Sequence, residues 1–100
     1  MNIVKLVNGK VELRKDNGLL LRTIVGSDAV DANINADGTL IVVTTSKGKV
    51  ELRKENGLLV RIICVRDAVA AKFSGAEILV TTTKGKIEIR KENGLLIRTI

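Results

Sequence analysis

The chain has 100 residues, 45% of them hydrophobic, and a formal net charge of +6 from 17 Lys and Arg against 11 Asp and Glu. This apolar fraction excludes a disordered chain, and the length suits one small domain. The sequence contains no histidine and a single cysteine, Cys64. These counts exclude a Ser-His-Asp triad, a histidine-ligated metal and an internal disulfide. We therefore expect no cofactor, and Cys64 is expected to be a buried, unreactive side chain.

No apolar run approaches the roughly 20 residues that a membrane-spanning helix requires. The first residues, MNIVKLV, lack the long apolar stretch and the cleavage site of a signal peptide. The sequence therefore predicts a cytoplasmic protein without membrane contact.

A sixteen-residue phrase occurs three times. It reads GKVELRKDNGLLLRTI from Gly9, GKVELRKENGLLVRII from Gly48 and GKIEIRKENGLLIRTI from Gly85, at offsets of 39 and 37 residues. This period indicates one structural unit repeated, and such a unit needs neighbours to bury its apolar face. The similarity of the copies indicates either recent duplication or a designed sequence.

The phrase itself predicts a β-hairpin. Apolar and charged residues alternate before each Asn-Gly pair, and a second apolar run follows it. Asn-Gly between two such runs favours a two-residue type I′ turn. With that loop, Val11 would pair with Ile24 and Leu13 with Arg22.

Further strands lie outside the phrases. The first residues supply one strand, and two more stand between successive phrases, so that a full unit has four antiparallel strands. No helical periodicity competes with this pattern. We expect eleven strands, of which those outside the phrases are 2–7, 29–35, 39–45, 68–74 and 77–83. The single domain, 1–100, would divide into a partial blade (1–24) and two blades (25–63 and 64–100).

The unit resembles a WD40-type repeat. The resemblance is carried by Asp28-Ala29-Val30 at the inner strand, by the Asp37-Gly38 turn, and by Thr44-Thr45 before a glycine-containing turn. The family's His is absent, its Trp-Asp pair falls near Arg53-Lys54, and its turn Asp is replaced by Lys47.

The resemblance implies an all-β fold of four-stranded antiparallel propeller blades, slightly under three per chain. A propeller ring needs at least four blades. We therefore expect oligomerisation to complete the ring, with a homodimer of about six blades first and a trimer as the alternative.

No constellation in the sequence indicates an enzyme. Glu12, Glu51 and Glu88 alternate with apolar residues and are expected to be cross-strand neighbours of Arg and Lys. We expect a structural or interaction scaffold without catalytic activity. Apart from a second copy of the chain, the sequence indicates no particular protein partner. A partner-binding face is predicted where the turns gather, at Ser27, Asp28, Lys47, Arg66, Asp67 and Lys84. Asp28 and Asp67 recur in the unit and are expected to make side-chain hydrogen bonds within their turns.

The alternative function is binding of a polyanion such as nucleic acid. Each phrase carries three basic residues that a ring would repeat along its rim. Neighbouring acidic residues and the near absence of aromatic residues weaken this hypothesis. The basic residues are Arg14, Lys15, Arg22, Arg53, Lys54, Arg61, Arg90, Lys91 and Arg98.

Overall fold

The computed structural model of the protein describes residues 2–100; Met1, the first residue of the predicted partial blade, lies outside them. The described residues form eleven β-strands, as the alternating pattern predicts, and no helix long and apolar enough to cross a membrane. The strands are β1 (Asn2–Val7), β2 (Lys10–Lys15), β3 (Leu20–Val25), β4 (Ala29–Ile34), β5 (Leu40–Thr45), β6 (Val50–Lys54), β7 (Leu59–Cys64), β8 (Ala68–Ser74), β9 (Glu77–Thr82), β10 (Ile87–Lys91) and β11 (Leu96–Thr99).

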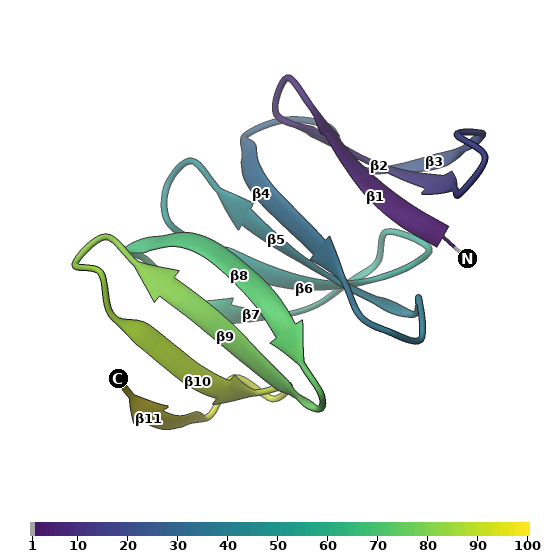
Figure 1. Cartoon of the computed structure of the whole chain (residues 1–100). Helices are drawn as coiled ribbons and strands as arrows, with labels where there is room; N and C mark the ends of the chain where they lie inside the picture. Colours follow the sequence, from purple (N-terminus) through teal and green to yellow (C-terminus); the bar gives the residue numbers. More distant parts are fainter. Residues whose placement is uncertain (1) are drawn as a thin grey trace.

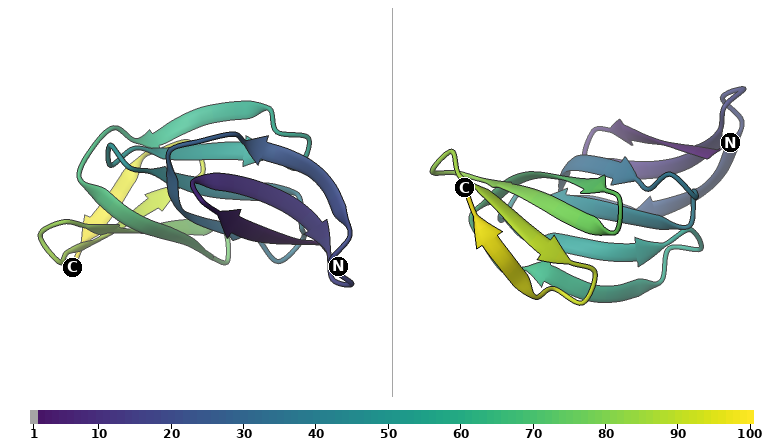
Figure 2. Two further views of the ribbon diagram at one scale, coloured as in Figure 1. Left: turned by 90° about the horizontal axis from the view of Figure 1, so that it is seen from above. Right: turned by 60° about the horizontal axis from the view of Figure 1, so that its bottom comes forward.

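These strands build three antiparallel sheets that stand in a row like the blades of a fan (Figure 1 and Figure 2). The first sheet contains β1 to β3, the middle sheet β4 to β7 and the last sheet β8 to β11. Each sheet is a meander, because strands that follow one another in sequence are paired. The two chain ends lie at opposite ends of the row (Figure 1).

The Asn-Gly turns differ from the predicted type I′ turn. That turn needs positive φ at both central residues, but Gly18 has a φ of 94° whereas Asn17 is not in that region. The N–H of Gly18 donates to the Lys15 oxygen at 2.8 Å, and the Lys15 N–H donates to the Leu19 oxygen at 2.9 Å. These bonds define a type I turn followed by a left-handed glycine. The later hairpins repeat them.

The predicted register of this hairpin holds only in its middle. Next to the longer loop a β-bulge brings Arg14 opposite Leu20. Leu13 pairs with Arg22, as predicted. Val11 pairs with Val25 rather than with Ile24, because a β-bulge between the two pairs adds one residue to β3.

The core lies between the sheets and not within any one of them. The first junction, between the first and middle sheets, buries Val11, Leu13, Ile24, Ala29, Ile41 and Val43. The second junction, between the middle and last sheets, buries Val42, Val50, Leu52, Ile63, Cys64, Ala68, Ala71, Ile78 and Val80. Cys64 is thus a buried thiol, as expected, and Phe73 packs against the same cluster.

Candidate functional site

Each repeat contains an arginine that ties its strand to its hairpin turn. Arg53 Nε donates to Glu51 Oε1 at 2.9 Å, and Arg53 Nη1 donates to the Gly57 main-chain oxygen at 2.8 Å. The repeated glutamates are therefore arginine partners, as predicted, but each lies on the same strand as its arginine and not across a strand pair. The equivalent arginines of the predicted basic set, with their partners, are Arg14 with Glu12 and Gly18, and Arg90 with Glu88 and Gly94.

A second arginine of each repeat reaches toward the next sheet; we call Arg22, Arg61 and Arg98 the junction arginines. Arg22 Nη1 donates to the Asn56 oxygen at 3.4 Å, and Arg61 Nη1 donates to the Asn93 oxygen at 3.5 Å. Both acceptors are main-chain oxygens of an Asn-Gly turn in the following sheet. Arg98 has the same place in the last sheet, and no residue in the range 2–100 accepts a hydrogen bond from it.

The remaining members of the predicted basic set are lysines at the end of the first strand of each phrase, before the Asn-Gly turn. Lys15, Lys54 and Lys91 are all exposed. Each is followed by an acidic residue. These lysines recur at one corner of each sheet, whereas the arginines are already hydrogen-bonded to protein groups in the first two sheets.

The predicted turn face is held together by main-chain contacts between neighbouring sheets. The Ala29 N–H donates to the Gly9 oxygen, and the Ala68 N–H donates to the Gly48 oxygen, both at 3.0 Å. These glycines also allow a close approach, since a Cβ at Gly48 would lie 2.6 Å from the nitrogen of Asp67.

The two recurring aspartates of this face act through their main chain. Asp28 and Asp67 both have a φ of 68°, a region that Asp tolerates better than most residues. Their main-chain oxygens accept from the N–H groups of Ser46 and Thr83, at 2.7 and 2.8 Å. The predicted side-chain turn bonds are therefore replaced by main-chain bonds, and the two carboxylates are exposed.

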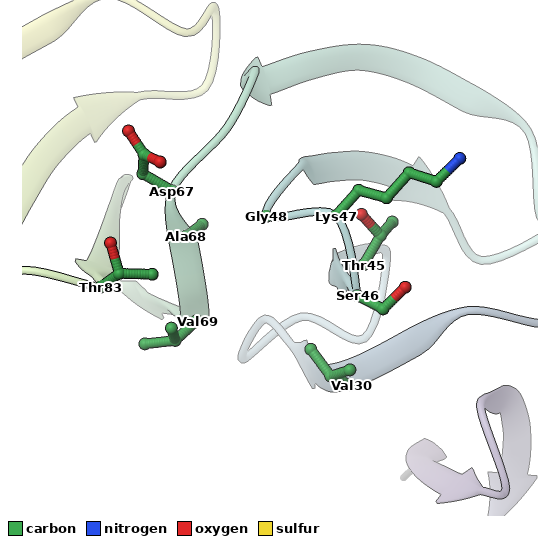
Figure 3. Close-up of a pocket in the computed structure, with 9 residues that line it drawn as sticks. All are labelled: Val30, Thr45, Ser46, Lys47, Gly48, Asp67, Ala68, Val69 and Thr83. Carbon is green, nitrogen blue, oxygen red and sulfur yellow. The ribbon is translucent and has the colours of Figure 1, made fainter.

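A hollow of about 500 Å³ opens on this face between the middle and last sheets. Lys47 and Asp67 stand on opposite sides of it with their charged ends pointing apart (Figure 3). Val30 and Val69 supply exposed apolar surface from β4 and β8.

The predicted partner-face residues divide between separate places. Lys47 and Asp67 share the larger hollow. A second hollow, of about 220 Å³, brings Arg66 and Lys84 beside Asp67. Ser27 and Asp28 line neither of the two hollows, and Asp28 lies against Gly9 at the first junction.

The inner strands of the middle and last sheets are joined by a polar contact that the sequence did not reveal. Asp31 Oδ2 accepts from the Ala71 N–H at 3.1 Å, and Asn33 Nδ2 donates to the Ala71 oxygen at 2.7 Å. Their partner is main chain, which leaves no residue signature in the sequence.

The outward surfaces of the two terminal sheets expose positions that the internal junctions bury. Ile3 of β1 is 41% exposed. Its equivalents in the other two sheets, Ile41 and Ile78, pair with the corresponding arginine of the next strand and are 0% exposed. On the last sheet the outward apolar residues, with the buried equivalents of the middle sheet in parentheses, are Leu79 (Val42), Ile87 (Val50) and Ile89 (Leu52).

Comparisons with known proteins identify both a family and a fold. The family model described as "Helicobacter pylori IceA2 protein" matches residues 1–63 of the chain. No curated protein matches the sequence.

Solved structures similar to the chain are β-propellers. They include the Neurospora crassa Pan2 WD40 domain (TM-score 0.75, 19% identity) and the C-terminal WD40 domain of Sif2 (TM-score 0.75, 18% identity). BamB from Moraxella catarrhalis is similar with a TM-score of 0.74 and 20% identity. The matches cover 98–99% of this chain but 32%, 30% and 34% of those chains.

At this level of identity the similarity shows the fold alone. The predicted all-β blades and the WD40-like resemblance are confirmed. The chain spans about a third of the length of these propellers.

Proposed function

The chain belongs to the family of the Helicobacter pylori IceA2 protein. Because it folds as β-propeller blades, we propose that it is an interaction scaffold whose ring is closed by a second copy. The described residues supply three sheets, and a propeller ring needs at least four. Two copies joined head to tail would give six. Three copies would give nine and are the alternative.

One observation carries this proposal: the two terminal sheets expose the surfaces that are buried inside the chain. Ile3 exposes a position that is completely buried in the other two sheets. At the other end Ile100 is 70% exposed, whereas Ile63 in the preceding phrase is 3% exposed. Apolar surface of this kind favours association. The outward surface of the last sheet repeats the side that the middle sheet presents to its neighbour, so we assign it as the contact for the first sheet of another copy.

The junction arginines indicate how that contact is oriented. Arg22 and Arg61 each reach the Asn-Gly turn of the sheet that follows. Arg98 would reach the next such turn at Asn17 of the second copy. At 3.4 and 3.5 Å the internal bonds are long, so we assign to Arg98 a role in orientation and little of the binding energy.

The two terminal surfaces also carry opposite charges where the internal junctions are apolar. Lys5 stands where the other sheets have Val43 and Val80, because each lies opposite the repeated glutamate. Glu77 stands where the middle sheet has Leu40. A head-to-tail contact brings surfaces of opposite charge together, whereas contacts between identical surfaces repeat one charge.

Light scattering during size-exclusion chromatography tests the proposal directly. We expect a mass of twice 10.8 kDa that decreases on dilution. A chain that stays at 10.8 kDa at all concentrations refutes closure by a second copy.

Two variants distinguish a head-to-tail contact from a symmetric one. Ile89→Arg blocks the last sheet and Ile3→Arg blocks the first, so each variant alone should be monomeric. An equal mixture should form a dimer, because one intact surface of each kind remains. A dimer of either variant alone refutes the head-to-tail contact. Val65→Arg, at a position that is 75% exposed, is the matched control and should not change the mass.

The second candidate function is polyanion binding, which the recurring exposure of Lys15, Lys54 and Lys91 favours. Binding of a labelled 20-nucleotide strand should then weaken steeply between 50 and 200 mM salt. Changing the three lysines to Gln should abolish it while the mass of the assembly stays the same. Binding that persists in the Gln variant or at high salt contradicts this function.

A further inference from the structure

The first sheet lacks the inner strand that the other two sheets have. β1 pairs with β2 in the register by which β5 pairs with β6 and β9 with β10, so it is the second strand of a blade. β4 and β8 cover the equivalent edges of β5 and β9. Within residues 2–100 no strand pairs with that edge of β1 (Figure 1). Such an edge presents N–H and C=O groups to an incoming strand.

The main-chain groups at this edge belong to Val4 and Leu6. In the last sheet Ala71 lies opposite Val80, but the N–H and C=O of Ala71 bond to side chains of β4. The pair is therefore not hydrogen-bonded, and Val80 directs its own groups toward β10. Lys5 has the place of Val80 in β1, so it is bonded to β2. Its neighbours Val4 and Leu6 then direct their groups to the open edge.

The inner strand of the middle sheet shows what an added strand would contact on its other side. Asp31 and Asn33 hold both main-chain groups of Ala71 in the neighbouring inner strand. Ala32 is the equivalent of Ala71 in β4, because both lie opposite the same valine position. No side chain among the described residues bonds to the main chain of Ala32. An added strand with Asp and Asn two residues apart could hold Ala32 in the same way.

The registers of β4 and β8 also fix the neighbouring positions of the added strand. Ile34 and Phe73 lie opposite the isoleucine that corresponds to Ile3, so an apolar residue fits there. The residue between Asp31 and Asn33 is Ala32, and its equivalent in β8 is also an alanine, Ala71, although that one lies between Ala70 and Lys72. In the first sheet the residue at this position would face Lys5, and an acidic side chain would gain a cross-strand ion pair.

We propose that β1 is an acceptor site for an extended peptide segment of the pattern Asp-small-Asn-apolar, which adds to the first sheet as an antiparallel inner strand. Main-chain bonds to Val4 and Leu6 give the affinity, and the Asp and Asn side chains give the specificity at Ala32. The site lies within one chain and does not depend on closure of the ring.

The probe that tests the proposal is a fluorescent nonapeptide with the sequence of β4 and its flanks, SDAVDANIN (residues 27–35). We titrate it with the full chain and follow fluorescence anisotropy. Saturable binding of one peptide per chain is expected. A peptide that carries alanine in place of both Asp31 and Asn33 cannot make the hydrogen bonds to the main chain of Ala32 in the full chain. It should bind roughly tenfold more weakly.

Two chain variants locate the peptide. Leu6→Pro removes an N–H that faces the open edge and not β2, so it should abolish binding while the circular dichroism spectrum is kept. Lys5→Glu changes an exposed side chain only. A peptide with Ala32→Asp should prefer the wild-type chain, and one with Ala32→Lys should prefer the Lys5→Glu chain, each by roughly two- to fivefold.

Amide hydrogen exchange supplies the last criterion. Protection by the peptide is expected at Val4 and Leu6. No saturable binding at millimolar peptide, equal binding of the alanine peptide, no preference in the charge exchange, or protection at β5 or β9 instead of β1 would each overturn the proposal. A monomeric chain that binds the peptide would refute ring closure alone, and a dimer that does not bind it would refute the acceptor site alone.

Discussion

Changing one repeat position to alanine in two different sheets measures how much of the free energy of unfolding depends on contact with a second copy. Leu52 and Ile89 hold equivalent places in β6 and β10, but Leu52 is 2% exposed within the second junction whereas Ile89 is only half-buried on the outward surface. A fully buried Leu→Ala change costs about 3 kcal/mol, from lost apolar burial and the cavity left behind. We therefore expect Leu52→Ala to lower the free energy of unfolding by about 3 kcal/mol at any protein concentration.

Ile89→Ala should behave differently. In a single chain part of its side chain contacts water already, so the cost should be smaller, about 1–2 kcal/mol. Where the ring is formed, Ile89 is buried like Leu52, and the cost should rise toward about 3 kcal/mol. Urea unfolding followed by circular dichroism at 1 and 100 μM checks both values. Equal losses for the two variants at 1 μM would refute the reasoning, because the outward surface would then be packed without a partner.

Three further predictions concern single positions. Thr44 is 0% exposed and its hydroxyl has no hydrogen-bond partner among the described residues, so Thr44→Val should raise the free energy of unfolding by about 1 kcal/mol in urea. Gly48→Ala should lower stability by several kcal/mol, because its Cβ would lie 2.6 Å from the Asp67 nitrogen. Gly85 has a similar φ but open space around it, so Gly85→Ala should lower stability by only about 1 kcal/mol. Equal losses of stability in thermal unfolding would contradict the close approach at Gly48. Arg53→Lys should lower stability by about 1–2 kcal/mol, because a lysine cannot bridge both the carboxylate and the turn oxygen; an unchanged melting temperature would contradict this role.

The sequence predicts the strands well because several independent features of it indicate the same structure. Alternation, glycine turns and the repeat period all indicate short antiparallel strands, and the WD40-like resemblance then indicates blades. The predicted turn type was wrong because the Asn-Gly pair suits both a type I′ turn and a type I turn that is followed by a left-handed glycine. The difference lies in the φ of Asn17, and its side chain stabilises the observed form by accepting the Leu19 N–H at 3.0 Å.

The contacts between sheets could not be predicted in the same way. Arg22 donates to Asn56, and Asp31 accepts from Ala71, over 34 and 40 residues of chain. In both contacts the partner is a main-chain group, which every residue has. Only the arrangement of neighbouring sheets shows which main-chain groups these two side chains reach.

The head-to-tail character of the proposed junction has a consequence for higher assembly. A surface that accepts the opposite surface of another copy closes only if the rotation between copies returns to its start. The first sheet has one strand fewer than the others, so the angle at that junction is set by three strands instead of four. A small change in that angle would turn a closed particle into an open helical filament. Solutions of this protein should therefore be observed by negative-stain electron microscopy at high concentration, where filaments would grow in place of rings.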